Sequence, residues 1–423
     1  MVAQVGWGAR PDGVVGGCDD AGVAQPSMSD RGPRAELVVD LAAVRHNVGL
    51  LSRGAAASGA ATMAVVKSDG YGHGAADVAR AALQAGASWL GVCTLDEALA
   101  LRADGIEAPV LSWLHLPHED FAPAVAAGVD LSVSSHGHLD AVLAGARAVD
   151  RPARLHLKID TGLSRNGCPE DDWPDLVDAA AKAAAAGRCE VVAVWSHLAV
   201  ADVARHPVTE AQAARFDAAW RVARDRGLTP IRHLANSAAT MTRPDLHYDL
   251  VRPGIAVYGL DPLGRPVAES PLRPAMTVRG RVVLVKQVRA GEGVSYGHEF
   301  TTPRDTVLAL VPIGYGDGVP RRMNFGGRMR VWLAGRSRPV VGRVCMDQVV
   351  VDCGPDGGAE VREGDVAVLF GPGDDGAPTA QEWADELGTI HYEVVTGVQG
   401  RRMTRTVVGR EAGPGTEQEG AAW

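Results

Sequence analysis

The chain has 423 residues, a formal net charge of −9 and 46% hydrophobic residues, values typical of a globular protein with two or more domains. An acidic chain without a basic block is a poor match for nucleic acid or an anionic membrane surface, and no apolar run reaches the ~18 residues that a membrane-spanning helix needs. The six cysteines form no Cys-x-x-Cys pair, so they predict reduced thiols in a cytoplasmic protein and no metal site.

The two ends of the chain lack the pattern of a folded segment. Residues 1–33 are rich in Gly, Asp and Pro and contain no apolar stretch like that of a signal peptide, so they predict a disordered extension. Residues 409–423, "GREAGPGTEQEGAAW", predict a disordered tail.

The first half of the remaining chain alternates β-rich runs with alanine-rich helical segments. "AELVVDL" predicts a strand, whose domain the sequence does not decide, and "DLAAVRHNVGLLSRGA" predicts a helix. Helix-like segments then separate eight β-rich runs: "TMAVVKSD", "SWLGVCT", "PVLSWL", "DLSVSS", "RLHLKID", "EVVAVWSH", "IRHLANS" and "VRPGIAVYG". Eight alternating units over ~200 residues predict a (β/α)8 barrel of the TIM type over 34–265.

The chain after Gly259 has a different pattern. Its runs are β-rich and broken by glycines, as in "MTVRGRVVLVKQVRAGEGVSYG" and "RMRVWLAGRSRPVVGRVCMDQVVVDC". Only "TAQEWADELG" has a helical pattern, with Thr379 as a candidate N-cap and Glu382 three residues later. We therefore expect a second, mostly β domain over 266–408.

Polar and cationic residues gather where the predicted barrel strands end. They are Lys67 in "AVVKSDGYGHG", Lys158 with Arg165 in the loop beyond it, His197, Asn236 with Ser237, and Arg252 before Gly254. Each has an ordinary explanation alone: a lysine at a strand end is often just the first exposed residue, and Asn236 could be a helix cap. Reactive groups of such barrels come from the carboxyl ends of the strands, so their joint occurrence on one rim predicts a site for an anionic ligand.

The same residues lie in motifs that resemble those of alanine racemases. "AVVKSDGYGHG" resembles the pyridoxal-phosphate (PLP) attachment motif of that family, and "RPGIAVYG" is also highly specific. Further matches follow in family order: "HLKIDTGLSRNG", "SHLAVAD", "HLANSAA", "VSYGHEF", "PIGYGDG", "GRVCMDQ" and "HYEV". The resemblance covers about Glu36 to Arg405, and it implies a PLP barrel followed by a β domain.

The resemblance also implies which residues hold PLP. Lys67 would carry the cofactor covalently, and Arg252 would lie beside the pyridine nitrogen, with His197 supporting it. Because Arg cannot accept a proton at neutral pH, the ring nitrogen should stay unprotonated, which favours brief proton exchange over transamination. The remaining cofactor-binding residues implied by the resemblance are Tyr71, Asn236, Ser237, Gly254, Ile255 and Tyr392.

Racemisation needs a base on each face of the reacting carbon. The resemblance implies Lys67 on one face and Tyr296, from the partner subunit of a homodimer, on the other. Arg165 would bind the substrate carboxylate, and Lys158, which is often carbamylated in the family, would orient Arg165. The other implied residues are Met346 at the substrate, Asp347 beside it and Tyr315 in the access channel.

Three other functions are compatible with parts of this pattern. A racemase of the same fold could act on serine or lysine, although some of those enzymes are exported and no signal peptide is evident here. A barrel-plus-β decarboxylase or aldolase is a second alternative, but such an aldolase should show clustered metal ligands in the β domain. A non-catalytic PLP carrier is a single barrel, so the β domain with Tyr296 argues against it. Two departures from the family pattern are Ser68 where alanine is common and His391 where proline is usual.

Overall fold

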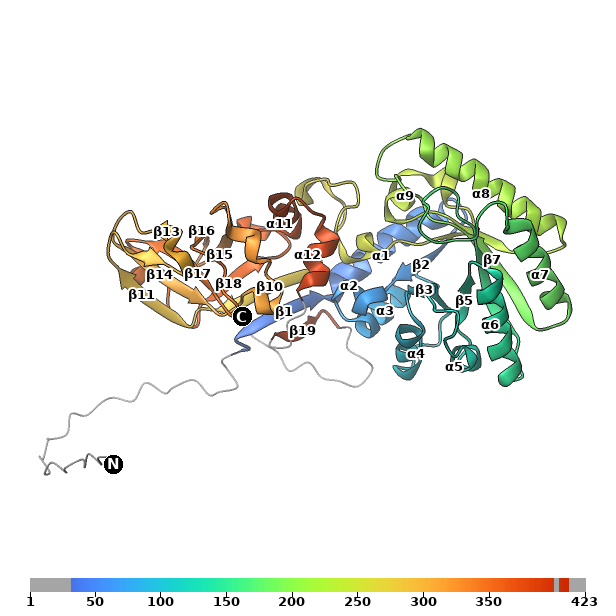
Figure 1. The fold of residues 1–423 in the computed structure, drawn as a ribbon. Helices are drawn as coiled ribbons and strands as arrows, with labels where there is room; N and C mark the ends of the chain where they lie inside the picture. The colour runs from blue at the N-terminus through green and yellow to red at the C-terminus, as the bar shows by residue number, and fades with distance from the viewer. Residues whose placement is uncertain (1–31, 399–402, 411–423) are drawn as a thin grey trace, which may run out of the picture. The chain divides into compact units, whose positions relative to one another are not determined.

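The computed structural model describes residues 32–398 and 403–410, so the predicted disordered segments 1–33 and 409–423 lie almost entirely outside the described residues. Two sheets organise the described part, one of eight parallel strands and one of nine strands (Figure 1). This confirms the predicted fold class, a TIM-type barrel followed by a mostly β C-terminal domain.

Seven of the eight parallel strands overlap the β-rich runs that the sequence predicts. The eighth run, "VRPGIAVYG", is extended only at Val251 of β9, and its Ile255–Tyr258 form the 3₁₀ turn η3, which corrects that part of the prediction. The order of the eight strands is β8-β7-β6-β5-β4-β3-β2-β9, so each strand pairs with its neighbour in sequence and β9 returns to β2. The strands are β2 (Ala61–Val65), β3 (Trp89–Val92), β4 (Val110–Ser112), β5 (Asp130–Val133), β6 (Ala153–Lys158), β7 (Cys189–Trp195), β8 (Ile231–His233) and β9 (Leu250–Val251).

The barrel is closed between β8 and β9 by separate hydrogen bonds. The backbone N–H of Arg252 donates to Ala235 O at 2.9 Å, and Asp249 N–H donates to Arg232 O at 3.1 Å. The first of these bonds joins the segments after the last two strands, where several predicted site residues lie.

Helices cover the outer side of the barrel strands (Figure 1). Several of them begin with standard capping groups: Asp40 Oδ1 accepts from Ala42 N–H at 2.7 Å at the start of α1, and Thr94 and Glu97 form a capping box at the start of α4. The helices are α1 (Leu41–Ala56), α3 (Ala75–Gln84), α4 (Leu95–Ala103), α5 (Ala122–Ala126), α6 (His136–Ala148), α7 (Trp173–Ala185), α8 (Pro207–Asp225) and α9 (Ser237–Thr242).

The larger sheet has the order β11-β14-β17-β16-β15-β18-β10-β1-β19. Its strands, with the separate pair β12–β13, are β1 (Ala35–Asp40), β10 (Met276–Arg281), β11 (Leu284–Val288), β12 (Gly293–Val294), β13 (Phe300–Thr301), β14 (Thr306–Val311), β15 (Arg330–Leu333), β16 (Arg336–Val341), β17 (Val349–Gly354), β18 (Val366–Phe370) and β19 (Thr404–Val408).

Strand β1 corrects the expected barrel range 34–265 at its beginning. Val38 pairs with Thr277 of β10 and with Thr406 of β19, so the first strand belongs to the larger sheet. Leu37 and Val39 are among its buried side chains. The barrel part therefore begins after β1.

The C-terminal part contains more helix than the sequence predicts. The expected helix is α11 (Ala380–Leu387), whose capping box between Thr379 and Glu382 is also as predicted. The structure adds the short helices α10 (Gly357–Glu360) and α12 (His391–Gly397), which were not predicted. At the predicted tail, Arg45 donates to Gly409 O at 2.6 Å, so contacts with the folded part extend past residue 408.

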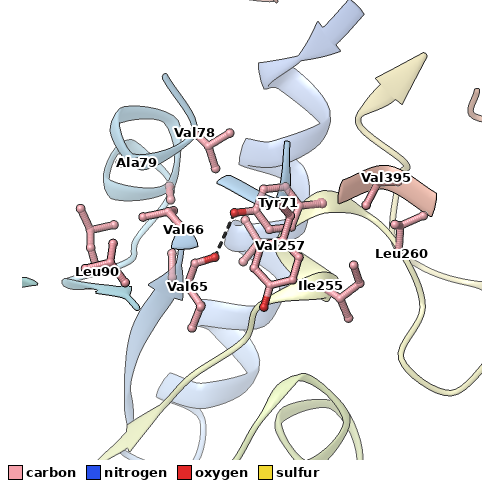
Figure 2. Close-up of a cluster of buried hydrophobic side chains, with 14 of the residues drawn as sticks. Val65, Val66, Tyr71, Val78, Ala79, Leu90, Ile255, Val257, Leu260 and Val395 are labelled. Carbon is pink, nitrogen blue, oxygen red and sulfur yellow. Dashed lines mark hydrogen bonds between the residues drawn. The ribbon is translucent and has the colours of Figure 1, made fainter. Parts of the chain in front are cut away.

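A continuous apolar core lies beneath the segment that carries Lys67. Figure 2 shows Val65 and Val66 of the β2 end beside Tyr71, together with Ile255 and Val257 from the segment after β9. The Tyr258 hydroxyl donates to Val65 O at 2.9 Å and joins the two segments. Burial of these side chains fixes the positions of the first and last barrel strands relative to each other.

Candidate active site

A cavity of about 820 Å³ lies at the carboxyl ends of the barrel strands. The C-terminal part contributes one wall of it through α12 and the residues before that helix. Eleven of the predicted site residues line this cavity: Lys67, Tyr71, Lys158, Arg165, His197, Asn236, Ser237, Arg252, Gly254, Ile255 and Tyr392.

Lys67 begins a left-handed turn. The element α2 (Lys67–Tyr71) follows β2, and Ser68, Asp69, Gly70 and Tyr71 all have positive φ, between 52° and 61°. Left-handed helical backbone costs L-residues roughly 1–2 kcal/mol each, so such a run persists only where the surroundings hold it. The turn directs the Lys67 side chain into the cavity, with Nζ 6.0 Å from the ring centres of both Tyr71 and Trp113.

Two carboxylates hold this turn. Glu97 Oε1 accepts from Ser68 N–H at 2.5 Å, while Glu97 Oε2 accepts from Cys93 N–H at 2.7 Å and from Thr94 N–H at 3.2 Å. Asp69 accepts from Ala75 N–H at 3.0 Å and forms an ion pair with Arg405. The turn is therefore fixed from α4 on one side and from β19 on the other.

Hydroxyl and backbone N–H groups converge at the side of the cavity near Gly254. A Cβ atom on Gly254 would lie 2.5 Å from the Tyr71 hydroxyl oxygen, so only glycine lets this hydroxyl lie against the backbone here. Ser237 Oγ is 2.8 Å from Gly254 N. Burial is the main factor that raises the pKa of Tyr71 above its usual range, and burial with the nearby Asp202 charge raises the pKa of Tyr392 to about 12. Both hydroxyls thus stay protonated and can donate to a phosphate.

The cavity also gathers positive charge. Lys158 ends β6 and is buried, with Nζ 4.2 Å from the Trp195 ring centre. Burial, followed by the charges of Arg252 and Arg165, lowers the pKa of Lys158 to about 7. Asp160 shapes the loop that carries Arg165 by accepting from the N–H groups of residues 162–164 at 2.8–3.2 Å. An anionic ligand is therefore favoured here.

Arg252 lies on the floor of the cavity and is only 5% exposed. Its Nη2 donates to Ser196 O at 2.7 Å and lies 3.4 Å from His197 Nδ1, while Nη1 donates to His233 Nδ1 at 3.0 Å. Burial lowers the pKa of Arg252 to about 9, which leaves the guanidinium charged at neutral pH. Burial and the Arg252 charge lower the pKa of His197 well below its usual value, so His197 is neutral.

A chain of buried polar groups continues from Arg252 into the barrel. His233 Nε2 is 2.8 Å from His156 Nδ1, and His156 Nε2 is 3.2 Å from Asp130 Oδ2. Arg252 can only donate, so His233 must accept at Nδ1 and carry its proton on Nε2. His156 must then accept at Nδ1 and donate from Nε2 to Asp130. Every hydrogen bond in the chain points toward the carboxylate.

Asp130 is the anionic end of that chain. Trp89 Nε1 donates to its Oδ2 at 3.1 Å, and Arg154 Nε donates to its Oδ1 at 2.6 Å. Burial alone would raise the pKa of Asp130, but the hydrogen bonds from His156 and Arg154 outweigh this effect and lower it.

The motifs in the sequence do not predict this row of hydrogen-bonded groups from Arg252 to Asp130. The available signal is a buried polar residue in each of three strands, namely Asp130 at the start of "DLSV", His156 inside "RLHLK" and His233 at the end of "IRH". Glu97 was also missed as a contact of the Lys67 turn. Asn236 has the helix-cap role weighed as its alternative, because its Oδ1 accepts from Ala239 N–H at 3.1 Å, although it lines the cavity as well.

Four predicted site residues do not line the cavity of this chain: Tyr296, Tyr315, Met346 and Asp347. They are exposed, with Tyr296 at 71%, Met346 at 54% and Tyr315 at 40%. Tyr296 begins the 3₁₀ turn η5 (Tyr296–His298) and Tyr315 begins η6 (Tyr315–Asp317), both in the C-terminal part.

The cavity is built for a covalently held anionic cofactor. A lysine amine lines it, hydroxyl and backbone N–H groups line it around Gly254, and the charged Arg252 lies on its floor. Across 32–398 and 403–410, no three His, Cys, Asp or Glu side chains are grouped as a metal site. In the same residues no helix combines the length and apolar character needed to cross a membrane.

Comparison with known proteins assigns the family. Residues 39–262 match the family model "Alanine racemase, N-terminal domain", and residues 275–407 match "Alanine racemase, C-terminal domain".

The chain belongs to the alanine racemase family.

Individual members of the alanine racemase family match nearly the whole chain. The alanine racemase of Salinispora arenicola is 56% identical over 378 residues, which are 89% of this chain and 99% of the relative. The solved alanine racemase of Streptomyces coelicolor A3(2) is 49% identical, with a TM-score of 0.85 over 90% of this chain and 100% of that one.

The PLP dependence of the family has a structural counterpart. A solved alanine racemase from Bartonella henselae is described with covalently bound pyridoxal phosphate; it is 29% identical, with a TM-score of 0.78 over 89% of this chain and 100% of that one. The donor set around Gly254 and the amine of Lys67 fit such a group.

Proposed function

We propose that this protein interconverts L-alanine and D-alanine with PLP as its cofactor, and so supplies D-alanine for peptidoglycan. The observation that carries the proposal is that one cavity is lined by Lys67, by hydroxyl and N–H groups that can bind a phosphate, and by Arg252. PLP, when bound, withdraws electrons from the α-carbon of an amino acid and makes its α-hydrogen acidic.

The residues of the cavity divide the tasks of holding cofactor and substrate. Lys67 is the covalent attachment point, and the Tyr71, Ser237 and Tyr392 hydroxyls with the N–H groups of Gly254 and Ile255 bind the phosphate. Arg252 would face the ring nitrogen of bound PLP and, as a group that can only donate, would keep that nitrogen unprotonated. Arg165 binds the substrate carboxylate, and a carbamylated Lys158 would orient it; the lowered pKa of Lys158 supports this because carbamylation requires a neutral amine.

Two bases exchange the α-hydrogen on opposite faces. Lys67 serves the face on which the D-enantiomer carries its hydrogen, and Tyr296 serves the other. Tyr296 is outside the cavity of its own chain and 71% exposed, which supports its entering the cavity of a second copy. Met346, Asp347 and Tyr315 accompany it. The working enzyme is then a homodimer with shared sites, located in the cytoplasm as expected for free thiols at all five described cysteines.

Chemical trapping tests the cofactor site. Borohydride reduction of the purified protein, followed by peptide mapping, should place the pyridoxyl group on Lys67. A label on Lys158 or Lys286 would contradict the assignment. Polarimetry with L-alanine, L-serine and L-lysine in separate reactions then tests the substrate, and fastest turnover of serine or lysine would exclude alanine as the preferred substrate.

Isotope exchange tests the two bases. In Tyr296→Phe, racemisation should fall by about 10²–10⁴-fold in both directions, since each turnover uses both bases. Exchange of the α-hydrogen with D₂O should nearly stop for L-alanine and persist for D-alanine. Equal exchange of both enantiomers would exclude this assignment.

Subunit mixing tests the shared site. Tyr296→Phe and Lys67→Ala subunits are each expected to be inactive. After confirmed subunit exchange, a mixed dimer should contain one site with both bases and regain activity. No recovery would place both bases in one chain.

A further inference from the structure

The backbone around Tyr296 has an unusual conformation for its sequence. Ser295 has φ 62° and ψ −171°, a combination that is almost confined to glycine. Gly297 and His298 also have positive φ, at 76° and 45°. A non-glycine residue in such a conformation costs of order 1–3 kcal/mol and persists only where other contacts hold it.

Contacts with the segment after β16 hold Ser295. Its Oγ donates to Arg343 O at 2.8 Å and lies 3.1 Å from Cys345 Sγ. Gly342 provides the necessary space, because a Cβ atom there would lie 2.8 Å from the Cβ of Ser295 and 2.6 Å from Val294 O. The Ser295 side chain is thus one hydrogen-bonded link between the two segments.

The same segment also holds the far side of the turn. Arg343 forms an ion pair with Glu299, and a Cβ atom on Gly297 would lie 3.3 Å from Arg343 Cζ. The chain then continues from Cys345 into Met346, which is 54% exposed. The residues on either side of Tyr296 are therefore fixed to the segment that leads to Met346.

The Tyr296 side chain itself has little support. Within its own chain it is 71% exposed, so packing inside the subunit does not set its direction, and the backbone on either side does so. A tyrosine that acts as a base in another subunit must reach the reacting carbon within hydrogen-bond distance, and a displacement of about 1 Å can cost 10²-fold in rate.

We infer that Ser295 is a positioning residue whose hydroxyl, bonded to Arg343 O, fixes the direction of Tyr296. The inference rests on the proposed function, in which Tyr296 is the second base. Ser295 does not touch the reacting atoms. Its effect should therefore be confined to the proton exchange that Tyr296 performs.

The test compares Ser295→Ala with Ser337→Ala in the holoenzyme. Ser337 of β16 is a matched control, because its Oγ accepts from Arg330 Nε at 2.7 Å within the C-terminal part instead of bonding the Tyr296 turn. In Ser295→Ala, α-hydrogen exchange with D₂O should fall about 10–100-fold for L-alanine and stay within twofold for D-alanine. Ser337→Ala should exchange both enantiomers as wild type does.

A second measurement does not depend on activity. With ¹³C-labelled tyrosine rings, six residues give signals, and those of Tyr296 are identified by their loss in Tyr296→Phe. The Tyr296 signals should move toward the position of free tyrosine in Ser295→Ala while the other five stay in place. Unchanged Tyr296 signals, or an equal loss of exchange for both enantiomers, would overturn the inference.

The two proposals fail separately. If Tyr296→Phe leaves L-alanine exchange intact, the two-base proposal fails. The ring signals still decide then whether Ser295 sets the direction of Tyr296.

Discussion

Replacing Asp130 by Asn should weaken the barrel through a single buried group. Three donors meet at this carboxylate, from Trp89, Arg154 and His156, and its side chain is 1% exposed. The Asn amide offers one oxygen and two N–H donors, so it cannot accept all three bonds.

The direction of the hydrogen-bond chain decides which bond is lost. If the Asn NH₂ group faced His156, His156 Nε2 would have to accept, so His156 and His233 would both carry their protons on Nδ1. The N–H of His233 would then face the N–H of Arg252, and two donors would oppose each other. The Asn oxygen must therefore face His156, and its NH₂ group faces Arg154 Nε. The variant loses one charge-assisted bond, worth about 1.5–3 kcal/mol, and leaves a donor against a donor, at about 1–3 kcal/mol.

The expected loss in free energy of unfolding is about 3 kcal/mol. This value is near the lower end of the range given by adding the two contributions, because the Arg154 side chain is 36% exposed and can hydrogen-bond to water instead. Urea unfolding followed by tryptophan fluorescence measures it. Glu190→Gln is the control, since it removes the charge of the exposed residue that Arg154 contacts at 2.7 Å and should cost less than about 1 kcal/mol.

The difference between wild type and Asp130→Asn should depend on pH. The pKa of Asp130 is lowered in the folded state, so its contribution is complete above the unfolded value of about 3.9 and declines as pH falls through the folded value. The difference in free energy of unfolding between wild type and Asp130→Asn should be constant from pH 6 to 8 and decrease below about pH 4. A loss no larger than that of Glu190→Gln, or a difference that stays constant into acid, would refute the account.

Three further predictions concern the cavity floor, the lysine turn and a cap. Arg252→Glu should lower racemisation by at least about 10²-fold and raise pyruvate formation by transamination, because a carboxylate beside the ring nitrogen favours its protonation; near wild-type racemisation without pyruvate would contradict this. Glu97→Ala should reduce the free energy of unfolding by about 2–3 kcal/mol, since Ser68, Cys93 and Thr94 lose their acceptor, whereas the exposed neighbour in Asp96→Ala should cost little. Thr379→Ala should cost about 1 kcal/mol in thermal unfolding by removing the α11 cap, and an unchanged melting temperature would argue against that cap.

The barrel could be predicted because its signals are local. Most strands are short apolar runs, several of the helices between them are followed by glycine, and polar residues at several strand ends mark the reactive rim. Lys67, Lys158 and Arg252 therefore come together in the cavity as expected. Helix α11 could also be predicted, since its capping box consists of two residues only three positions apart in the sequence.

What could not be predicted depends on contacts between distant segments. Strand β1 has partners about 240 and 370 positions away, and no local pattern encodes a choice of sheet. Predicting the hydrogen bonds that lead from Arg252 to Asp130 requires the register of strands β5 to β8. The alternation of polar and apolar residues along each strand does not give that register. The strain at Ser295 was hidden because serine at positive φ is uncommon and the residue that permits it, Gly342, lies in another segment.

The left-handed turn at Lys67 has a consequence for how the protein acquires activity. An isolated chain would not visit this turn, because three of its four left-handed residues are not glycine. The bonds that hold it come from Glu97, 29 positions along the chain, and from Arg405, 336 positions along. Ring closures of that length form late in folding. We therefore expect the reactive amine to take its place only after both sheets have assembled, so that a refolding enzyme regains its secondary structure before it can retain cofactor.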